Sequence, residues 1–439
     1  MPLIRSIGRW SLTALVINCI IGSGIFGVPG ELIQSLGRAS PLAMVLAGLG
    51  AGVVLACFAE IGSQFSEPGG VYLFARTAFG RFVGLQVGWF WFLSTLGGAA
   101  ACSNLFLHYL AGFAPWAEHS VPRLLIITGL FLVPTAANYI GVRGGTMLSN
   151  LFTIAKLLPM ALLIVLGLIR FGHHAEMLRA AEIKSPGWRA WGDALLLLAF
   201  AYSGFEDVTM PTGEVKNPQR TVPLSLCGGL TVCIAVYTLL QFVIVATVGT
   251  TATDRPLAAS ATVLIGRSGA LFVEIAAMIA TYGWLSASMV TAPRFLFSLA
   301  EKRDFPAVFG RLHARFNTPH LSVIFFAGLA WLLAITGTFR WSLLLSAGAA
   351  MVFDGFICAA LLRLRRIQPQ AAGFRLPFGG GFSFLGVGIC LFLLGRMELK
   401  AALLMGVTGL WAAVNWWWAA QRSREQAPPT CPMPDIAAP

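Results

Sequence analysis

Long apolar windows, bounded by charged residues or by Pro and Gly, follow one another through almost the whole chain. A helical bilayer crossing needs about 20 mostly apolar residues. The windows are continuous and do not alternate with polar residues, which excludes a transmembrane β-barrel. We therefore predict an all-α integral membrane protein with twelve transmembrane helices, near residues 12–35, 40–65, 82–112, 122–141, 147–171, 191–214, 222–249, 269–299, 320–338, 341–363, 380–396 and 401–420.

Composition supports this class. Of the 439 residues 57% are hydrophobic and 11% are charged, against about 25% charged in soluble domains. The eight cysteines form no C-x-x-C pair, so neither a disulfide framework nor a metal site is expected. The first apolar segment is too long for a cleavable signal peptide, and no nucleotide-binding P-loop is present. We expect no cofactor.

The net charge of +12 has a topological interpretation. With a cytoplasmic N-terminus and alternating loops, 18 of the 30 Lys and Arg residues fall on the inner side. This excess follows the positive-inside rule. It predicts a multi-pass protein of the cell (plasma or inner) membrane, surrounded by lipid, with both termini cytoplasmic and no nucleic-acid partner.

Two windows are interrupted in the same way. The first contains Ser23-Gly24 followed by Pro29, and the sixth contains Ser203-Gly204 followed by Pro211. The two Ser-Gly pairs are 180 residues apart. Each interrupted window opens a block of five helices. Such paired breaks are typical of inverted-repeat transporters, whose substrate lies near the bilayer midplane. The alternative is a pair of ordinary glycine-packed or proline-kinked helices.

Four stretches in order resemble the amino acid-polyamine-organocation (APC) superfamily of permeases, over roughly residues 10–365. They are Gly22-Ser23-Gly24-Ile25-Phe26 with Pro29, Ala59-Glu60-Ile61-Gly62 through Pro68-Gly69-Gly70-Val71-Tyr72 to Ala78-Phe79-Gly80, Glu214-Val215-Lys216-Asn217-Pro218 with Pro223, and Arg294 through Leu299-Ala300 to Phe305-Pro306 and Thr318-Pro319.

The resemblance implies alternating access by a 5+5 inverted-repeat core with two peripheral helices. The first repeat would cover residues 1–171 (helices 1–5) and the second residues 191–366 (helices 6–10). Residues 380–420 would form peripheral helices 11 and 12. The Pro-rich residues 421–439 are predicted to be a disordered cytoplasmic tail.

The breaks offer partners to both charged groups of an amino acid. Amides at the start of the outer half of helix 1 suit a carboxylate, and Ser23 and Gly24 are the candidates. Freed carbonyls suit an ammonium, and similarity to the family points to Ile20, Phe200 and Ser203. The candidate substrate-binding residues are Ile20, Ile21, Gly22, Ser23, Gly24, Ile25, Phe200, Ala201, Ser203 and Glu206. For Ser23 and Ser203 the alternative is hydrogen bonding to a carbonyl of the same helix.

Ionisable residues inside membrane windows indicate function by default. By the resemblance, Lys156 replaces a coupling sodium ion, reaching carbonyls of helix 1 and the hydroxyls of Ser286 and Ser288; snorkelling to an interface is the alternative. Glu206 is a candidate for proton sensing or for contact with a cationic substrate, with Asp207 as its competitor. Lys156, Ser286, Ser288 and Glu206 form the predicted coupling set.

Further predictions concern other polar and aromatic residues. The resemblance implies that Phe200 is an aromatic lid over the substrate, and Trp284 is a further aromatic candidate for the pocket. Glu60 is expected to pair with Arg76, Arg81 or Arg294 near the inner side. Glu274 and Asp354 match no motif and are given no role.

The leading interpretation is a secondary transporter of neutral amino acids, driven by protons or by exchange. Phe200 and Ile25 give the pocket an apolar wall, and Glu206 is the one acidic residue placed firmly in the break. The alternative is a polyamine or cationic amino acid exchanger with Glu206 as counter-charge. A membrane enzyme is disfavoured because the windows contain no nucleophile–base pair or metal cluster. A nutrient sensor without transport activity is a third alternative, which the sequence leaves open. The sequence does not define the oligomeric state.

Overall fold

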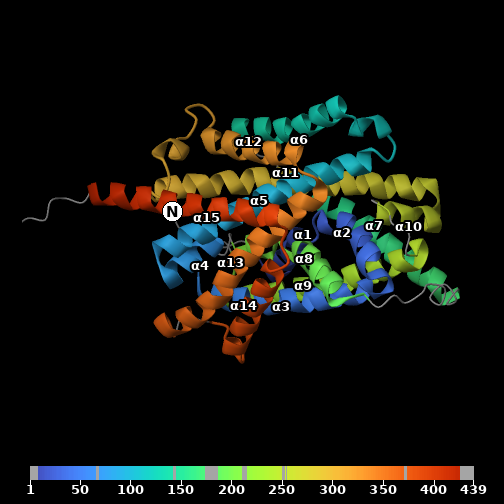
Figure 1. Cartoon of the computed structure of the whole chain (residues 1–439), viewed down its shortest axis with the longest axis horizontal. Coiled ribbons are helices and arrows are strands. Elements are labelled where there is room, and N and C mark those ends of the chain that lie inside the picture. The colour runs from blue at the N-terminus through green and yellow to red at the C-terminus, as the bar shows by residue number, and fades with distance from the viewer. Residues whose placement is uncertain are drawn as a thin grey trace, which may run out of the picture.

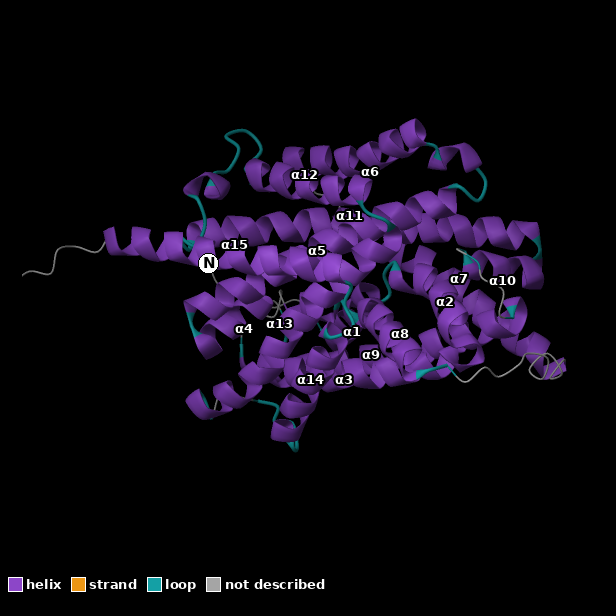
Figure 2. Cartoon of the chain, in the orientation of Figure 1, coloured by secondary structure: helices purple, strands orange, loops and turns teal. Residues whose placement is uncertain are grey.

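The described part of the chain is helical and contains no strand (Figure 2). The computed structural model describes residues 8–65, 69–141, 145–173, 186–209, 215–249, 253, 255–369 and 373–425. The predicted end of the sixth window at residues 210–214, and residues 426–439 of the predicted tail, lie outside these ranges. The all-helical fold class is confirmed.

The first half contains two more helices than its five apolar windows. The window at 12–35 is split into α1 (Arg9–Ile20) and α2 (Gly24–Leu36), and α4 precedes α5 as an additional helix. Helix α4 has only 10 residues and contains Arg76 and Thr77, so its sequence does not form a long apolar window. The other elements are η1 (Gly37–Ala39), α3 (Ser40–Gln64), α4 (Gly70–Phe79), α5 (Arg81–Leu110), η2 (Pro115–Glu118), α6 (Ser120–Ile140) and α7 (Gly145–His173).

The second half begins with another split helix. The window at 191–214 becomes α8 (Trp188–Tyr202) and the short turn η4 (Phe205–Thr209). Helix α10 was not predicted, and α15 continues past the predicted end at residue 420. The remaining elements are α9 (Pro218–Val248), α10 (Pro256–Ile265), α11 (Arg267–Glu301), η6 (Ala307–Gly310), α12 (His320–Thr336), α13 (Phe339–Ile367), α14 (Gly379–Leu394) and α15 (Leu399–Glu425).

Seven segments of the described chain are long and apolar enough to cross a membrane. They are Gly24–Gln64, Arg81–Leu110, Ser120–Ile140, Pro218–Val248, Arg267–Glu301, Phe339–Ile367 and Leu399–Arg422. Shorter apolar helices, α1 and α12 among them, account for further windows. Every predicted window overlaps a helix, and the count of twelve crossings stays a prediction.

Most long helices run in nearly the same direction, along the long axis of the molecule (Figure 1). Helix α4 and the C-terminal end of α15 lie at one end, which we call the α4 end, and α10 lies at the opposite end. Helices α6 and α12 pack together on one flank. The central helix α5 is the most deeply buried of the seven candidate spans. Gly97 allows this position, because a Cβ atom there would lie 2.9 Å from the Ser346 amide nitrogen of α13.

Candidate functional site

The two helix breaks face each other in the core. Helix α1 ends at Ile20 and α8 ends at Tyr202, and the chain continues after a short non-helical stretch in both cases. Gly204 has a φ of +104°, a backbone conformation that favours glycine, and a Cβ atom there would overlap the Cys19 carbonyl. A Cβ atom on Gly24 would lie 2.7 Å from the Ala201 Cα atom. Glycines therefore let the two breaks pack directly against each other.

A small cavity of about 30 Å³ lies between the breaks. Its wall includes seven of the ten predicted substrate-binding residues. Ile21, Ile25 and Ala201 are buried behind this wall, with 0–1% of their surface exposed. The lining residues are Cys19, Ile20, Gly22, Ser23, Gly24, Trp91, Ser94, Thr95, Phe200, Ser203, Gly204, Glu206, Asp207, Trp284 and Ser346.

One side of the cavity is formed by the N-terminus of α2. Among the described residues, the amides of Ser23, Gly24 and Ile25 meet no acceptor, and the first hydrogen bond of this turn joins the Phe26 amide to the Ser23 carbonyl at 3.1 Å. The Ser23 side chain is 2% exposed and carries a hydroxyl into the same region. Unpaired amides and the positive end of a helix dipole form an anion-binding site. A carboxylate fits it.

The carbonyls predicted for the ammonium are partly occupied. The Ile20 carbonyl accepts from the Gly22 amide at 2.8 Å and from the Tyr237 hydroxyl at 3.0 Å. The Phe200 carbonyl accepts from the amide and the hydroxyl of Ser203, at 3.3 and 2.8 Å. The Ser203 side chain therefore makes a local hydrogen bond to a carbonyl of α8, as the alternative interpretation of this residue predicts. The Ser203 carbonyl has no donor among the described residues and can accept a further hydrogen bond.

Both acidic residues of the second break line the cavity. A Glu206 oxygen accepts the Gly204 amide at 2.8 Å, and an Asp207 oxygen accepts the Trp91 indole N–H at 3.1 Å. Glu206 is 6% exposed and Asp207 is half-buried. The sequence-based argument that only Glu206 is placed firmly in the break is therefore wrong, because Trp91 holds Asp207 there as well. This pairing across 116 residues left no local signal.

The side chain of Lys156, on α7, hydrogen-bonds to the C-terminal end of α1. Its ammonium donates to the carbonyls of Asn18 and Ile21, at 2.6 Å each, and the side chain is 5% exposed. The last carbonyls of a helix lack intrahelical partners and attract cations. The amine is therefore held inside the protein and does not snorkel to an interface. The Ser288 hydroxyl donates to the Leu285 carbonyl of its own helix. In the described structure neither Ser288 nor Ser286 hydrogen-bonds to Lys156.

Sequence analysis missed the cavity residues from α5 and α13. Ser94 and Ser346 donate reciprocally to each other's carbonyls, at 3.0 and 2.8 Å, and Thr95 also lines the wall. The available signal was a set of hydroxyl residues inside otherwise apolar windows. It is weak, because Ser and Thr also occur at ordinary helix–helix contacts in membranes.

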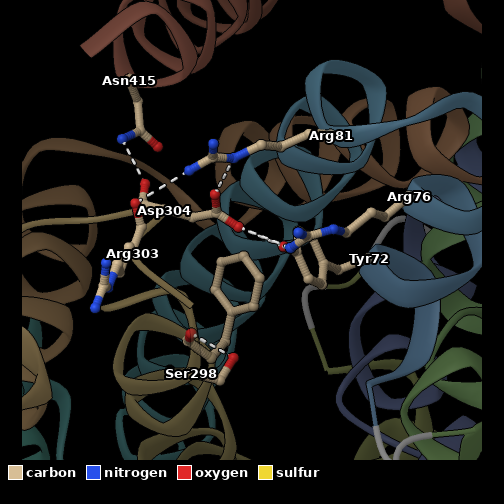
Figure 3. A network of polar contacts seen from close by, with 8 residues as sticks. Tyr72, Arg76, Arg81, Ser298, Arg303, Asp304 and Asn415 are labelled. Atoms are coloured by element: carbon tan, nitrogen blue, oxygen red, sulfur yellow. Dashed lines mark hydrogen bonds and ion pairs between the residues drawn. The ribbon is translucent and has the colours of Figure 1, made fainter. Parts of the chain in front are cut away.

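A second polar cluster lies at the α4 end and centres on the fully buried carboxylate of Asp304 (Figure 3). This carboxylate accepts from the Tyr72 hydroxyl at 2.6 Å, from Arg76 at 3.0 Å and from the Arg81 Nε atom. The Asn415 amide of α15 donates to the Asp304 carbonyl at 2.8 Å. Burial, together with the hydrogen bond and charge of Asp304, raises the pKa of the Tyr72 phenol. The cluster ties α4, α5 and α15 to the loop after α11.

Glu60 lies outside this cluster, which corrects its predicted pairing. Both of its carboxylate oxygens bind Arg365 of α13, at 2.7 and 2.6 Å, and one oxygen also accepts the Leu376 amide at 2.8 Å. Arg76 and Arg81 instead bind Asp304. The partner of Glu60 is 305 residues away in the chain, beyond the reach of arguments from neighbouring motifs. Glu274, which had no assigned role, pairs with Arg255 at 2.6 Å.

Apolar candidate spans surrounding a polar, partly unwound centre define a multi-pass membrane transporter. The sequence model of the family described as "Amino acid permease" matches residues 7–420. The chain belongs to this family, which confirms the resemblance to APC permeases. The curated relatives of this family that match the chain are named as transporters. The protein is therefore a transporter of the amino acid permease family and not an enzyme.

Curated relatives match the chain nearly end to end. It is 28% identical to the serine/threonine exchanger SteT of Bacillus subtilis, with 92% of this chain and 95% of the relative covered. It is 27% identical to a methylthioribose transporter of the same species, with 94% and 92% covered. It is 26% identical to an arginine/agmatine antiporter of Chlamydia pneumoniae, with 90% and 86% covered.

Proposed function

We propose that the protein is a secondary active transporter that moves small neutral amino acids across the cell membrane by alternating access. The observation that carries this proposal is the cavity between the breaks, with unpaired amides of α2 on its wall and two carboxylates on the other break. A zwitterion can place its carboxylate on the Ser23 and Gly24 amides and its ammonium near the Ser203 carbonyl and Glu206. The several hydroxyls of the wall suit a small polar side chain.

The architecture of the proposal is a 5+5 inverted repeat. Residues 1–171 and 191–366 form the two repeats, each opening with a broken helix, and residues 380–420 form the two peripheral helices that complete the twelve crossings. The α4 end faces the cytoplasm, so that both termini are cytoplasmic. The placement of Ser23-Gly24 and Ser203-Gly204 in opposing breaks supports the inverted repeat. The excess of Lys and Arg in the loops of the α4 end supports the orientation.

Protons are the proposed coupling ion. The ammonium of Lys156 occupies the position at the end of α1 where a cation satisfies the carbonyls of Asn18 and Ile21. A lysine can release and regain a proton when its environment changes, so its hold on α1 can differ between conformations. Protonation differences of this kind let a proton gradient bias the two states.

A cationic amino acid or polyamine is the second candidate substrate. Asp207 favours it, because Asp207 and Glu206 give the cavity two carboxylates and, among the described residues, no basic side chain lines the wall. The arginine/agmatine antiporter among the relatives agrees with this alternative.

Uptake into proteoliposomes tests the proposal. Purified protein is reconstituted, and labelled serine, alanine, leucine and arginine are supplied with and without a pH gradient, and with or without unlabelled amino acid inside. We expect uptake of the small neutral amino acids, stimulated by an inward proton gradient or by internal substrate. Selective uptake of arginine would support the cationic alternative. Absence of uptake of every amino acid tested would overturn the proposal.

A further inference from the structure

Asp354 is a buried carboxyl group near the middle of α13, a helix of 29 residues. Its surface is 4% exposed, and its Oδ1 atom has no hydrogen-bond partner. Within the described residues, Asp354 takes part in no ion pair, whereas Glu60, Glu274 and Asp304 are each neutralised by arginine. Asp354 therefore lacks the arginine partner that neutralises each of these three buried acids.

The groups that face Asp354 are acidic or neutral. Asp354 interacts electrostatically with Glu206 of η4, Cys57 of α3 and Cys390 of α14, and with Cys358 one turn further along α13. None of these groups carries a positive charge. An ionised carboxylate without a counter-charge or donors is strongly disfavoured in such surroundings. In this arrangement Asp354 is accommodated as the neutral acid, with its proton bound.

The position of Asp354 links the cavity to the α4 end. Ser346, two turns earlier on α13, lines the cavity, at a distance of about 12 Å along the helix axis. Arg365, three turns later, binds Glu60 at the α4 end. Asp354 also interacts electrostatically with Glu206 in the cavity wall. It thus lies between the substrate cavity and the side proposed to open to the cytoplasm.

We propose that Asp354 is a proton-binding site of the transport cycle, in addition to the groups that line the substrate cavity. Water or buffer gives a proton to the carboxylate, and an O–H bond forms. When the α4 end opens and water reaches the side chain, this bond breaks and the proton passes to water on that side. The inference rests on the proposed transport function.

The same chemistry couples protonation to conformation. Hydration stabilises the ionised carboxylate in the open state, whereas closing around Asp354 would bury an uncompensated charge. The transporter must therefore regain the proton before it closes. Exchange, which requires repeated opening and closing at the α4 side, is expected to slow as the pH on that side rises.

The variant Asp354→Asn tests the site, because an amide of the same shape cannot ionise. Asp193→Asn is the matched control, since Asp193 is an exposed aspartate on α8. Infrared spectra at neutral pH should show the C=O band of a protonated carboxylic acid in the parent protein and in Asp193→Asn, with a loss of intensity in Asp354→Asn. Identical spectra for the parent and Asp354→Asn would overturn the proposal, whether or not transport is observed.

Exchange in proteoliposomes of uniform orientation gives the functional readout. With the outer pH fixed, raising the pH on the α4 side should slow exchange by the parent and by Asp193→Asn, approaching tenfold per pH unit once one carboxyl ionises. Exchange by Asp354→Asn should depend on this pH less steeply than exchange by the parent. A parent that exchanges amino acids at a rate independent of this pH would refute the role of Asp354 and leave the transport proposal intact. A parent that shows no amino acid transport would instead refute the transport proposal, and with it the role of Asp354 in transport.

Discussion

The ammonium of Lys156 lies 2.6 Å from the carbonyl oxygen of Ile21, the first residue beyond the end of α1. A second bond of the same length joins it to Asn18. The two bonds connect α7 to the break in the first helix and supply a positive charge where the helix dipole is negative. Any change in the protonation of this lysine therefore acts directly on the element that carries the proposed carboxylate site.

Replacing Lys156 by Met tests its role in coupling. The side chain keeps a similar length, but two charge-assisted hydrogen bonds are lost and two carbonyls are left without the donor. We expect proton-driven accumulation to disappear while exchange of internal for external substrate persists. Accumulation and exchange are measured in the same proteoliposomes, with sodium absent and then added. A strict sodium requirement of the parent protein would contradict the account.

Replacing Ser23 by Ala tests the carboxylate site. The hydroxyl adds one donor to the amides of α2, and a hydrogen bond to a charged group contributes about 1.5–3 kcal/mol. We expect the apparent KM to rise roughly tenfold or more, with little change in the maximal rate. Ser35→Ala on the same helix is the control, since Ser35 is exposed and bonds to the Glu31 carbonyl. Equal KM values for the two variants would remove Ser23 from the site.

Glu206→Gln and Asp207→Asn separate the two substrate classes. Gln retains an oxygen that accepts the Gly204 amide, so the break is expected to keep its shape. For a neutral substrate, Glu206→Gln should preserve binding and flatten the pH dependence of transport. A competition panel of serine, leucine, arginine, lysine and diamines provides the measurement. Selective loss of the cationic competitors in either variant would support the cationic alternative.

Asp304→Asn is expected to destabilise the protein. Asp304 is fully buried, whereas the side chains of Arg76 and Arg81 are 36% and 26% exposed. Solvent therefore screens the attraction between each arginine and the carboxylate. Breaking a buried ion pair costs about 3–5 kcal/mol, and we expect about 2 kcal/mol here because of this exposure. Glu118→Gln, which removes an exposed partner of His108, is the control. Thermal unfolding of both variants in detergent should show a lower Tm for Asp304→Asn alone.

The helices and the breaks could be predicted because each has a local cause in the sequence. Apolar windows mark the helices, Gly204 permits the non-helical backbone of the second break, and Gly24 permits the close approach of α2 to Ala201. Helix α4 escaped prediction because its polar positions interrupt the apolar pattern that defined the windows. The packing of α4 against α5 and α13 stabilises it instead.

Contacts between distant segments could not be predicted in the same way. The sequence identified Glu206 and Asp207 as ionisable residues at a break, but only folding brings Trp91 to Asp207. Arg365 was counted as a charge on the inner side, and its pairing with Glu60 depends on how α13 packs on α3. Residue type therefore pointed to the right regions, while partner choice depended on tertiary structure.

The most direct test of the central claim is a structure of the protein with its transported amino acid bound. The account predicts the substrate carboxylate at the Ser23 and Gly24 amides and the ammonium facing the Ser203 carbonyl and the carboxylates of the second break. An amino acid bound outside the cavity between α2 and η4, or bound there with its carboxylate turned toward Glu206, would contradict it.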